Sequence, residues 1–132
     1  ILYYCRHYYH QKTTIFHVGS IAAKESVGSV SYNAAKSALN SYVRTLSKSI
    51  IKYNICVTGI NPGGFEYRGN AMYRLKKSNP LGYKNFINTR TITNKMPKAN
   101  ELLPIIITLI SDNNFAYTGN MISCDFGEGN YY

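Results

Sequence analysis

The feature that most constrains the fold is a long helical pattern bounded by two short apolar runs. Residues 13–19 (TTIFHVG) and 54–60 (NICVTGI) are rich in β-branched and apolar side chains, which is typical of strands. Between them, apolar residues recur at steps of three and four over 31–52, which predicts one helix with Ser31 as its N-cap. Strands joined through a helix usually pair in parallel, with helices on both faces of the sheet. We therefore expect an α/β fold.

The rest of the chain continues this alternation, apart from one long polar segment. Residues 99–111 predict a second helix and residues 120–125 a third strand, while residues 3–11 are compatible with the end of another helix. Residues 65–95 are polar, basic and weakly periodic, which predicts an irregular excursion of a kind that is often functional or mobile. The prediction is one domain with three parallel strands, two main helices and an irregular segment.

The composition excludes several classes of protein. Of the 132 residues, 45% are hydrophobic and 16% are charged, as in globular domains. No apolar run reaches the roughly 18 residues of a membrane span, and the N-terminal residues lack the basic-then-apolar order of a signal peptide. Cys5, Cys56 and Cys124 lie far apart in the sequence. We therefore expect reduced thiols in a cytoplasmic protein, with no disulfide framework, no metal site and no membrane partner.

The chain is strongly basic, with a net charge of +9 from 15 Lys and Arg residues against 6 Asp and Glu residues. Such a balance can indicate binding to nucleic acid or another polyanion. The basic residues are spread along the sequence, and only residues 74–77 form a small cluster. This distribution favours a solvated surface, so we expect no nucleic-acid partner and keep a polyanion-binding module as a minor hypothesis.

Three polar side chains are candidates for acid–base chemistry. Tyr32 and Lys36 lie four residues apart at the start of the predicted helix, which places both on one face. A free tyrosine has a pKa of about 10, and a neighbouring ammonium stabilises the phenolate, so such a pair can exchange a proton near neutral pH. Ser20 directly follows the first strand, where its hydroxyl can donate to a carbonyl oxygen. Each residue taken alone is more often structural, and their joint order carries the prediction.

Four successive motifs resemble the C-terminal motifs of the short-chain dehydrogenases/reductases. Tyr-x-x-x-Lys alone is a weak signal, whereas four motifs in the right order at plausible gaps are a strong one. The resemblance covers residues 13–65 and 97–129. The motifs are IFHVGSIAA at 15–23, SYNAAKSALN at 31–40, VTGINPGGF at 57–65 and TGNMISCDFG at 118–127.

The resemblance implies a partial Rossmann-like three-layer fold with a parallel sheet. It also implies hydride transfer between NAD or NADP and a small carbonyl or alcohol substrate. Ser20 would polarise the substrate carbonyl and Tyr32 would give or take the proton. Lys36 would activate Tyr32 and bind the nicotinamide ribose, so that Tyr32 and Lys36 would also contact the cofactor.

The resemblance further implies where cofactor and substrate would lie. Pro62, Gly63 and Phe65 would lie beside the nicotinamide, and residues 65–95 would be the variable substrate-binding loop. The glycine-rich βαβ unit that binds the pyrophosphate would precede Ile1. Residues 1–132 are therefore expected to be the C-terminal catalytic part of the domain, and the isolated chain is expected to bind cofactor poorly.

Two hypotheses about function follow from the resemblance. The first is an NAD(P)-dependent oxidoreductase that acts on a small molecule and forms a homo-oligomer, for which the long helix at 31–52 is a candidate interface. The second is a truncated, non-catalytic remnant of such an enzyme, which keeps the motifs without the phosphate-binding half.

Overall fold

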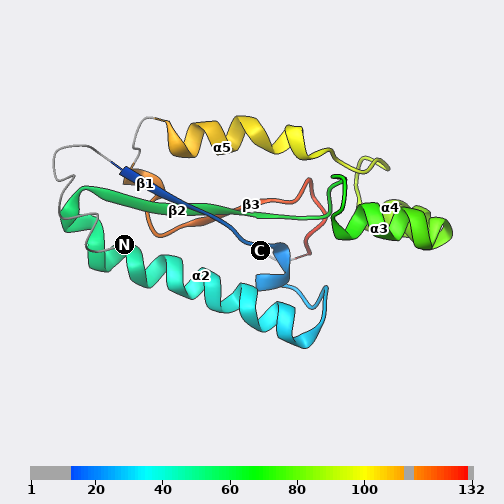
Figure 1. The fold of residues 1–132 in the computed structure, drawn as a ribbon, viewed down its shortest axis with the longest axis horizontal. Coiled ribbons are helices and arrows are strands. Elements are labelled where there is room, and N and C mark those ends of the chain that lie inside the picture. The colour runs from blue at the N-terminus through cyan, green and yellow to red at the C-terminus, as the bar shows by residue number, and fades with distance from the viewer. Residues whose placement is uncertain (1–12, 112–114, 131–132) are drawn as a thin grey trace.

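The computed structural model describes residues 13–111 and 115–130 and shows a sheet between two helical layers (Figure 1). All neighbouring strands of the sheet are parallel. The central strand is buried at all eight positions, because helices cover both of its faces. The expected parallel α/β sheet is confirmed, and the helix expected at 3–11 lies outside the described residues. The strands, in spatial order, are β1 (Thr13–Val18), β2 (Ile55–Pro62) and β3 (Met121–Cys124).

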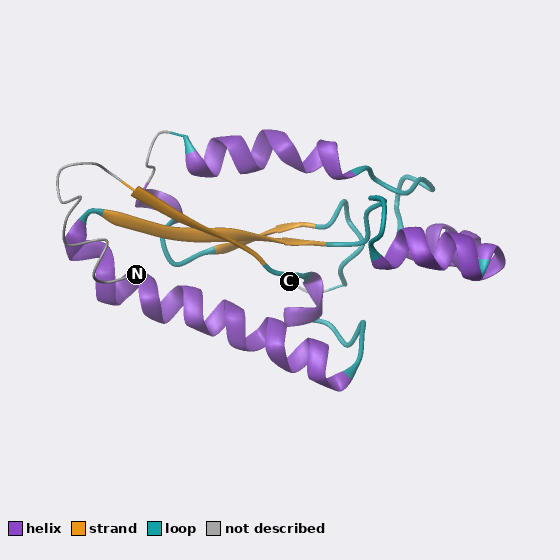
Figure 2. Cartoon of the chain, viewed as in Figure 1, coloured by secondary structure: helices purple, strands orange, loops and turns teal. Residues whose placement is uncertain are grey.

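Helix α2 (Val30–Ile50) covers one face of the sheet and α5 (Leu103–Ile110) covers the other (Figures 1 and 2). Val43 of α2 packs in a buried cluster against the first half of β2. Leu109 of α5 packs with Ile60 in a second cluster on the opposite side. The sheet therefore has two apolar cores, one beneath each helix, which fix its position relative to both helical layers.

The long helix begins two residues earlier than the sequence predicts. Its N-cap is Ser29, whose Oγ accepts a hydrogen bond from the Tyr32 backbone N–H at 3.2 Å. The prediction of Ser31 as N-cap is wrong, because the cap at Ser29 places Ser31 inside the first turn. At the other end, a 3₁₀ turn, η2 (Ile51–Tyr53), follows the helix, and Asn54 at φ 60° ends it.

The central strand is longer than the sequence predicts. An end at Ile60 was expected, because Asn61 and Pro62 open a turn-like stretch. Both residues instead continue the strand, because β3 lies alongside, with Asn61 opposite Ser123 and Pro62 opposite Cys124. Pro62 is tolerated as the final residue of the strand, where a missing N–H costs least.

The prediction of an irregular segment over 65–95 is wrong, because that segment contains two helices. These are α3 (Ala71–Ser78) and α4 (Pro80–Arg90), and they lie beyond the carboxyl ends of the strands (Figure 1). Their caps are asparagines. Asn70 accepts from the third residue of α3 at 2.9 Å, and Asn79 accepts from the third residue of α4 at 2.9 Å. No residue of α3 is buried, so this helix contributes nothing to the buried core.

The second predicted helix, over 99–111, divides into the 3₁₀ turn η3 (Ala99–Leu102) and α5. The face of α2 that carries Ala34, Ala38 and Tyr42 is exposed, and the Tyr42 ring makes an edge-to-face contact with His17 of β1, with ring centroids 5.8 Å apart. Within residues 13–111 and 115–130, no helix is both long and apolar enough to cross a membrane.

Candidate active site

A cavity lies at the carboxyl end of the sheet, where the loops after β1 and β2 approach α3 and α4. Its volume is about 590 Å³. Ser20 after β1, Tyr32 in the first turn of α2, and Gly63 and Phe65 after β2 all line it. The carboxyl ends of parallel strands are where open α/β sheets bind their ligands. Four of the six predicted site residues therefore share one cavity.

Ser20 is held in place by its backbone as well as its side chain. Its N–H donates to Asn61 Oδ1 at 3.1 Å. Its Oγ accepts from the Ala22 N–H at 3.2 Å and so caps the 3₁₀ turn η1 (Ile21–Ala23). A hydroxyl that accepts one bond still has its own proton to donate. The cap therefore orients Ser20 and leaves its O–H available for a ligand in the cavity.

Tyr32 and Lys36 lie on the same face of α2, as their spacing predicts. Lys36 Nζ lies 5.7 Å from the centre of the Tyr32 ring and donates to the carbonyl oxygen of Val18, the last residue of β1, at 3.2 Å. The ammonium is thus positioned between the tyrosine ring and the end of the strand. Lys36 is not among the residues that line the cavity, whereas Tyr32 lines it and is 45% exposed.

The loop after β2 requires glycine. A Cβ on Gly63 would lie 2.6 Å from the Glu128 carboxylate, and a Cβ on Gly64 would lie 3.0 Å from the Phe86 ring. Pro62 is buried in the strand and does not line the cavity. The structure therefore brings Gly63 and Phe65 to the cavity wall and places Pro62 behind it, where it leads the chain into the loop.

Asn61 is a positioning residue that the sequence prediction missed. It is fully buried, and its Oδ1 holds the Ser20 N–H. A Cβ on Gly19 would lie 2.1 Å from this oxygen, so the close approach depends on glycine there. Within the described part of the chain, Asn61 Nδ2 is buried without a hydrogen-bond partner. The available signal in the sequence was an asparagine that directly follows the mainly apolar run at 55–60.

The sequence also did not predict a charged cluster of Glu25, Arg90 and Glu128, of which Glu128 lines the cavity. Glu128 lines the cavity, is 6% exposed, and accepts from the Gly64 N–H. Arg90 lies 3.6 Å from Glu128 and 2.8 Å from Glu25. Burial raises the pKa of Glu128. A hydrogen bond from the Asn130 backbone, followed by the one from Arg90, lowers the pKa of Glu25. These residues come from three distant segments, so no local pattern indicates them.

The segment 65–95 contributes one wall of the cavity, through residues of α3 and α4. Met72 and Phe86 supply apolar surface and Arg74 supplies a charge. Within the two described ranges, no three His, Cys, Asp or Glu side chains are placed to hold a metal ion. The cavity can therefore present hydroxyl, cationic and apolar groups to a small molecule.

A family model described as enoyl-(acyl carrier protein) reductase matches residues 1–128. Among curated proteins, none matches the chain. L-sorbose reductase from Gluconobacter frateurii, solved with NADPH and L-sorbose, is 25% identical with a TM-score of 0.77, over 91% of this chain and 48% of its own.

Two further solved structures share the fold. A short chain dehydrogenase family protein from Francisella tularensis is 22% identical with a TM-score of 0.76, over 89% of this chain and 51% of its own. A 4-hydroxyisoleucine dehydrogenase complexed with NADH is 23% identical with a TM-score of 0.78, over 92% of this chain and 49% of its own. The chain spans about half the length of these proteins. Its fold is the corresponding part of a Rossmann-like domain, and the chain belongs to the short-chain dehydrogenase/reductase family.

Proposed function

We propose that these residues form the catalytic site of an NAD(P)-dependent oxidoreductase that interconverts a carbonyl and an alcohol. Ser20, Tyr32 and Lys36 are its catalytic residues. The observation that carries the proposal is that Ser20 and Tyr32, from different elements, line one cavity, while the Lys36 ammonium lies against the Tyr32 ring. Family membership supports the same reaction class.

The three side chains have complementary roles in carbonyl reduction. The Ser20 hydroxyl donates to the substrate oxygen, which stabilises negative charge as it develops there. The Tyr32 hydroxyl gives its proton to the same oxygen as the alcohol forms. The Lys36 ammonium stabilises the phenolate that remains on Tyr32. In alcohol oxidation the proton moves in the opposite direction, from the substrate hydroxyl to Tyr32.

The residues present suit the nicotinamide end of a dinucleotide, which supplies or accepts the hydride when bound. The Lys36 ammonium has three donors, of which one reaches the Val18 carbonyl, so two remain for ribose hydroxyls. Gly63 and Phe65 would lie along the nicotinamide, and Pro62, the last residue of β2, precedes that loop. The cofactor is NAD or NADP. Sorbose reductase was solved with NADPH, and the 4-hydroxyisoleucine enzyme with NADH.

Residues 65–95 form the substrate side of the proposed site. Met72 of α3 and Phe86 of α4 face a cavity that also holds Ser20 and Tyr32. A small-molecule substrate bound there has its carbonyl near the hydroxyls and its body against α3 and α4. We also propose that the protein is a homo-oligomer, with the exposed face of α2 that carries Tyr42 as the interface.

A non-catalytic remnant of the family is the second candidate. It predicts an intact cavity without turnover. An assay of the complete product of the gene, set beside the 132-residue chain, separates the two candidates.

The proposed chemistry is tested by Tyr32→Phe in the complete gene product, assayed for nicotinamide-dependent reduction of a panel of ketones. We expect turnover to fall by about 10²–10⁴-fold, the usual contribution of a positioned proton donor. Tyr42→Phe is the matched control, because Tyr42 lies on the same helix and is similarly exposed, at 46% against 45%, without lining the cavity. Equal turnover by Tyr32→Phe and the wild type rejects the assignment. No turnover by the wild type supports the remnant.

A further inference from the structure

The two charged side chains that line the cavity differ in how far the protein itself neutralises them. Glu128 is buried and already satisfied, because it accepts from the Gly64 N–H and lies 3.6 Å from the Arg90 guanidinium. A ligand that approaches Glu128 therefore meets a carboxylate whose charge is already balanced by Arg90. The other charged lining residue is Arg74.

Arg74 is in a different situation. It projects from α3, and its Nη1 donates to the carbonyl oxygen of Gly69. In the described part of the chain, no carboxylate forms an ion pair with it. The nearest acidic residue in the sequence, Glu66, is paired with Lys76 at 2.9 Å and with the Tyr83 hydroxyl at 2.7 Å. Arg74 thus keeps its charge and most of its five donors for a ligand.

The rest of the cavity lining is mainly apolar. Ile21, Val27, Met72 and Phe86 contribute side chains to it. Arg74 is itself exposed, so a ligand can reach its guanidinium from the cavity. The planar fork of arginine matches the two oxygens of a carboxylate or phosphate.

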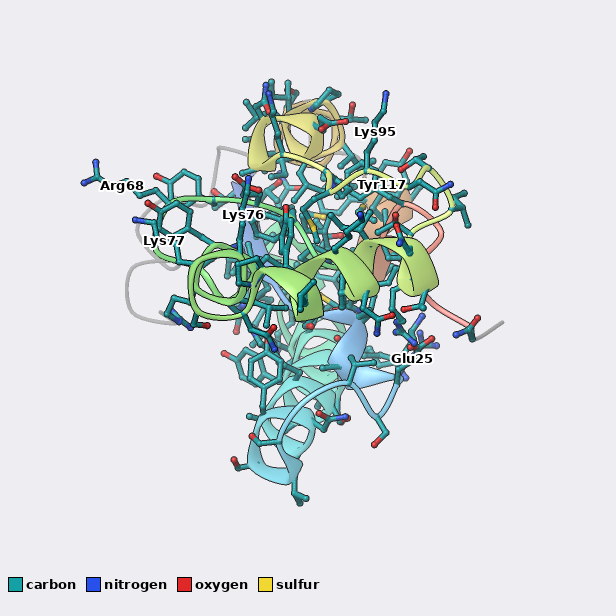
Figure 3. All side chains as sticks on the ribbon, turned by 90° about the vertical axis from the view of Figure 1, so that its right-hand side faces the viewer. Glu25, Arg68, Lys76, Lys77, Lys95 and Tyr117 are labelled. Carbon is teal, nitrogen blue, oxygen red and sulfur yellow. The ribbon has the colours of Figure 1, made fainter. Side chains whose placement is uncertain are left out.

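Two other cations of the same region do not share this position. Arg68 and Lys77 extend outward from the molecule beside α3 (Figure 3) and do not line the cavity. They raise the local concentration of anions near the cavity mouth without binding a ligand inside it. Arg74 is therefore the residue of this basic segment that can select a substrate.

We infer that the substrate carries an anionic group, a carboxylate or a phosphate, which Arg74 binds while an apolar body joins that group to the reacting carbonyl. This inference rests on the proposed function and names the substrate class of the same site. It makes Arg74 a specificity-determining residue. It also gives the weakly periodic segment 65–95 a defined role, which is to present one cation to the cavity.

The test compares keto acids with their uncharged methyl esters. The probes are 4-oxopentanoate and 6-oxoheptanoate, each with its methyl ester, together with 6-oxoheptyl phosphate. Equilibrium binding is followed by NMR titration and turnover by nicotinamide absorbance, both in the complete gene product. We expect the wild type to favour an acid over its ester by about tenfold or more in both readouts, because an arginine–carboxylate pair is charge-assisted. The phosphate probe decides which anion is preferred, and the two chain lengths show the preferred separation from the carbonyl.

Three variants isolate the contribution of Arg74. Arg74→Gln should bring the acid-to-ester ratio close to one, and Arg74→Lys should leave an intermediate ratio, since it keeps the charge without the fork. Lys77→Gln is the matched control, because it removes a charge from the same helix outside the cavity lining, and its ratio should equal that of the wild type. Circular dichroism of each variant confirms that it is folded.

The inference and the proposed function fail in different ways. Reduction of the ketones with no preference for the acids overturns the inference and leaves the proposed function standing. An acid preference in binding that Arg74→Gln abolishes, with no turnover of any probe, upholds the inference and contradicts the proposed function. An acid preference that survives in Arg74→Gln also overturns the inference.

Discussion

The central sheet and the α3–α4 pair are held together by different forces. Strand β2 is buried at every position, with apolar clusters on both sides. Helix α3 has no buried residue, and in α4 only Tyr83 is buried. The loops that follow β1 and β2 and the α3–α4 pair border the same cavity. The comparison shows that the scaffold depends on hydrophobic burial, whereas the wall that faces the substrate depends on a few polar contacts and can change with little effect on the core.

Two polar clusters attach the α3–α4 pair to the rest of the molecule. Glu66 accepts from Lys76 on α3 and from the Tyr83 hydroxyl on α4. Arg90, the last residue of α4, forms ion pairs with Glu25 and with Glu128, which lines the cavity. The first set of contacts is made near the junction of α3 and α4, and the second is made at the end of α4, so the pair is attached at two places.

The largest effect on stability is expected from the central strand. Ile60→Ala should lower the free energy of unfolding by about 2–5 kcal/mol, because it removes a fully buried side chain and leaves a cavity. Leu81→Ala in α4 is the matched control, since Leu81 is 81% exposed, and it should change stability by no more than about 0.5 kcal/mol. Urea unfolding of both variants measures the difference. Similar losses in the two would contradict the division between scaffold and wall.

An intermediate effect is expected from the charged cluster. Arg90→Met should cost about 1–3 kcal/mol at neutral pH, because it leaves the buried Glu128 carboxylate without its cation. Urea unfolding at several pH values measures this loss and its pH dependence.

The sign of the pH dependence follows from the two carboxylates. Burial raises the pKa of Glu128 in the fold, so its contribution to stability is present at low pH and is lost as pH rises through that value. The pKa of Glu25 is lowered, so its contribution is present above its ordinary value and is lost as pH falls. Arg90 supports the ionised form of both, so the cost of Arg90→Met should grow from about pH 4 to pH 7. A cost that does not vary over this range would show that Arg90 acts through packing alone.

The smallest effect is expected from Tyr83→Phe, which removes one hydrogen bond to a carboxylate and should cost about 1–2 kcal/mol. The loss of stability should be local. Amide hydrogen exchange should become faster in α3 and α4 and should not change in β2. Burial, with a hydrogen bond to Glu66, raises the pKa of Tyr83 to about 12. Its contribution should therefore persist to pH 10 and be lost as pH rises through about 12. Phenolate absorbance, compared between the wild type and the variant, checks this value, and uniform exchange across the sheet would contradict the local effect.

The parts that the sequence predicts correctly are those with a strong local pattern. Helix α2 repeats apolar residues at the helical period, and β1, β2 and β3 are rich in β-branched and apolar residues. Ser20 follows β1 closely, and Tyr32 lies in the first turn of α2. Helices α3 and α4 were not predicted because they are short, lie in a polar and basic segment, and begin at asparagine caps. Asn61 and Glu128 escaped it because their partners are far away in the sequence, 41 residues in one case and 64 in the other.

The central claim is that Ser20 and Tyr32 act on the same substrate oxygen. The most direct measurement is a double-mutant cycle of Ser20→Ala and Tyr32→Phe on nicotinamide-dependent turnover by the complete gene product. Residues that act as a unit are strongly non-additive, so the double variant should be about as slow as the slower single variant. Independent effects, with the two losses multiplying in the double variant, would contradict a shared site.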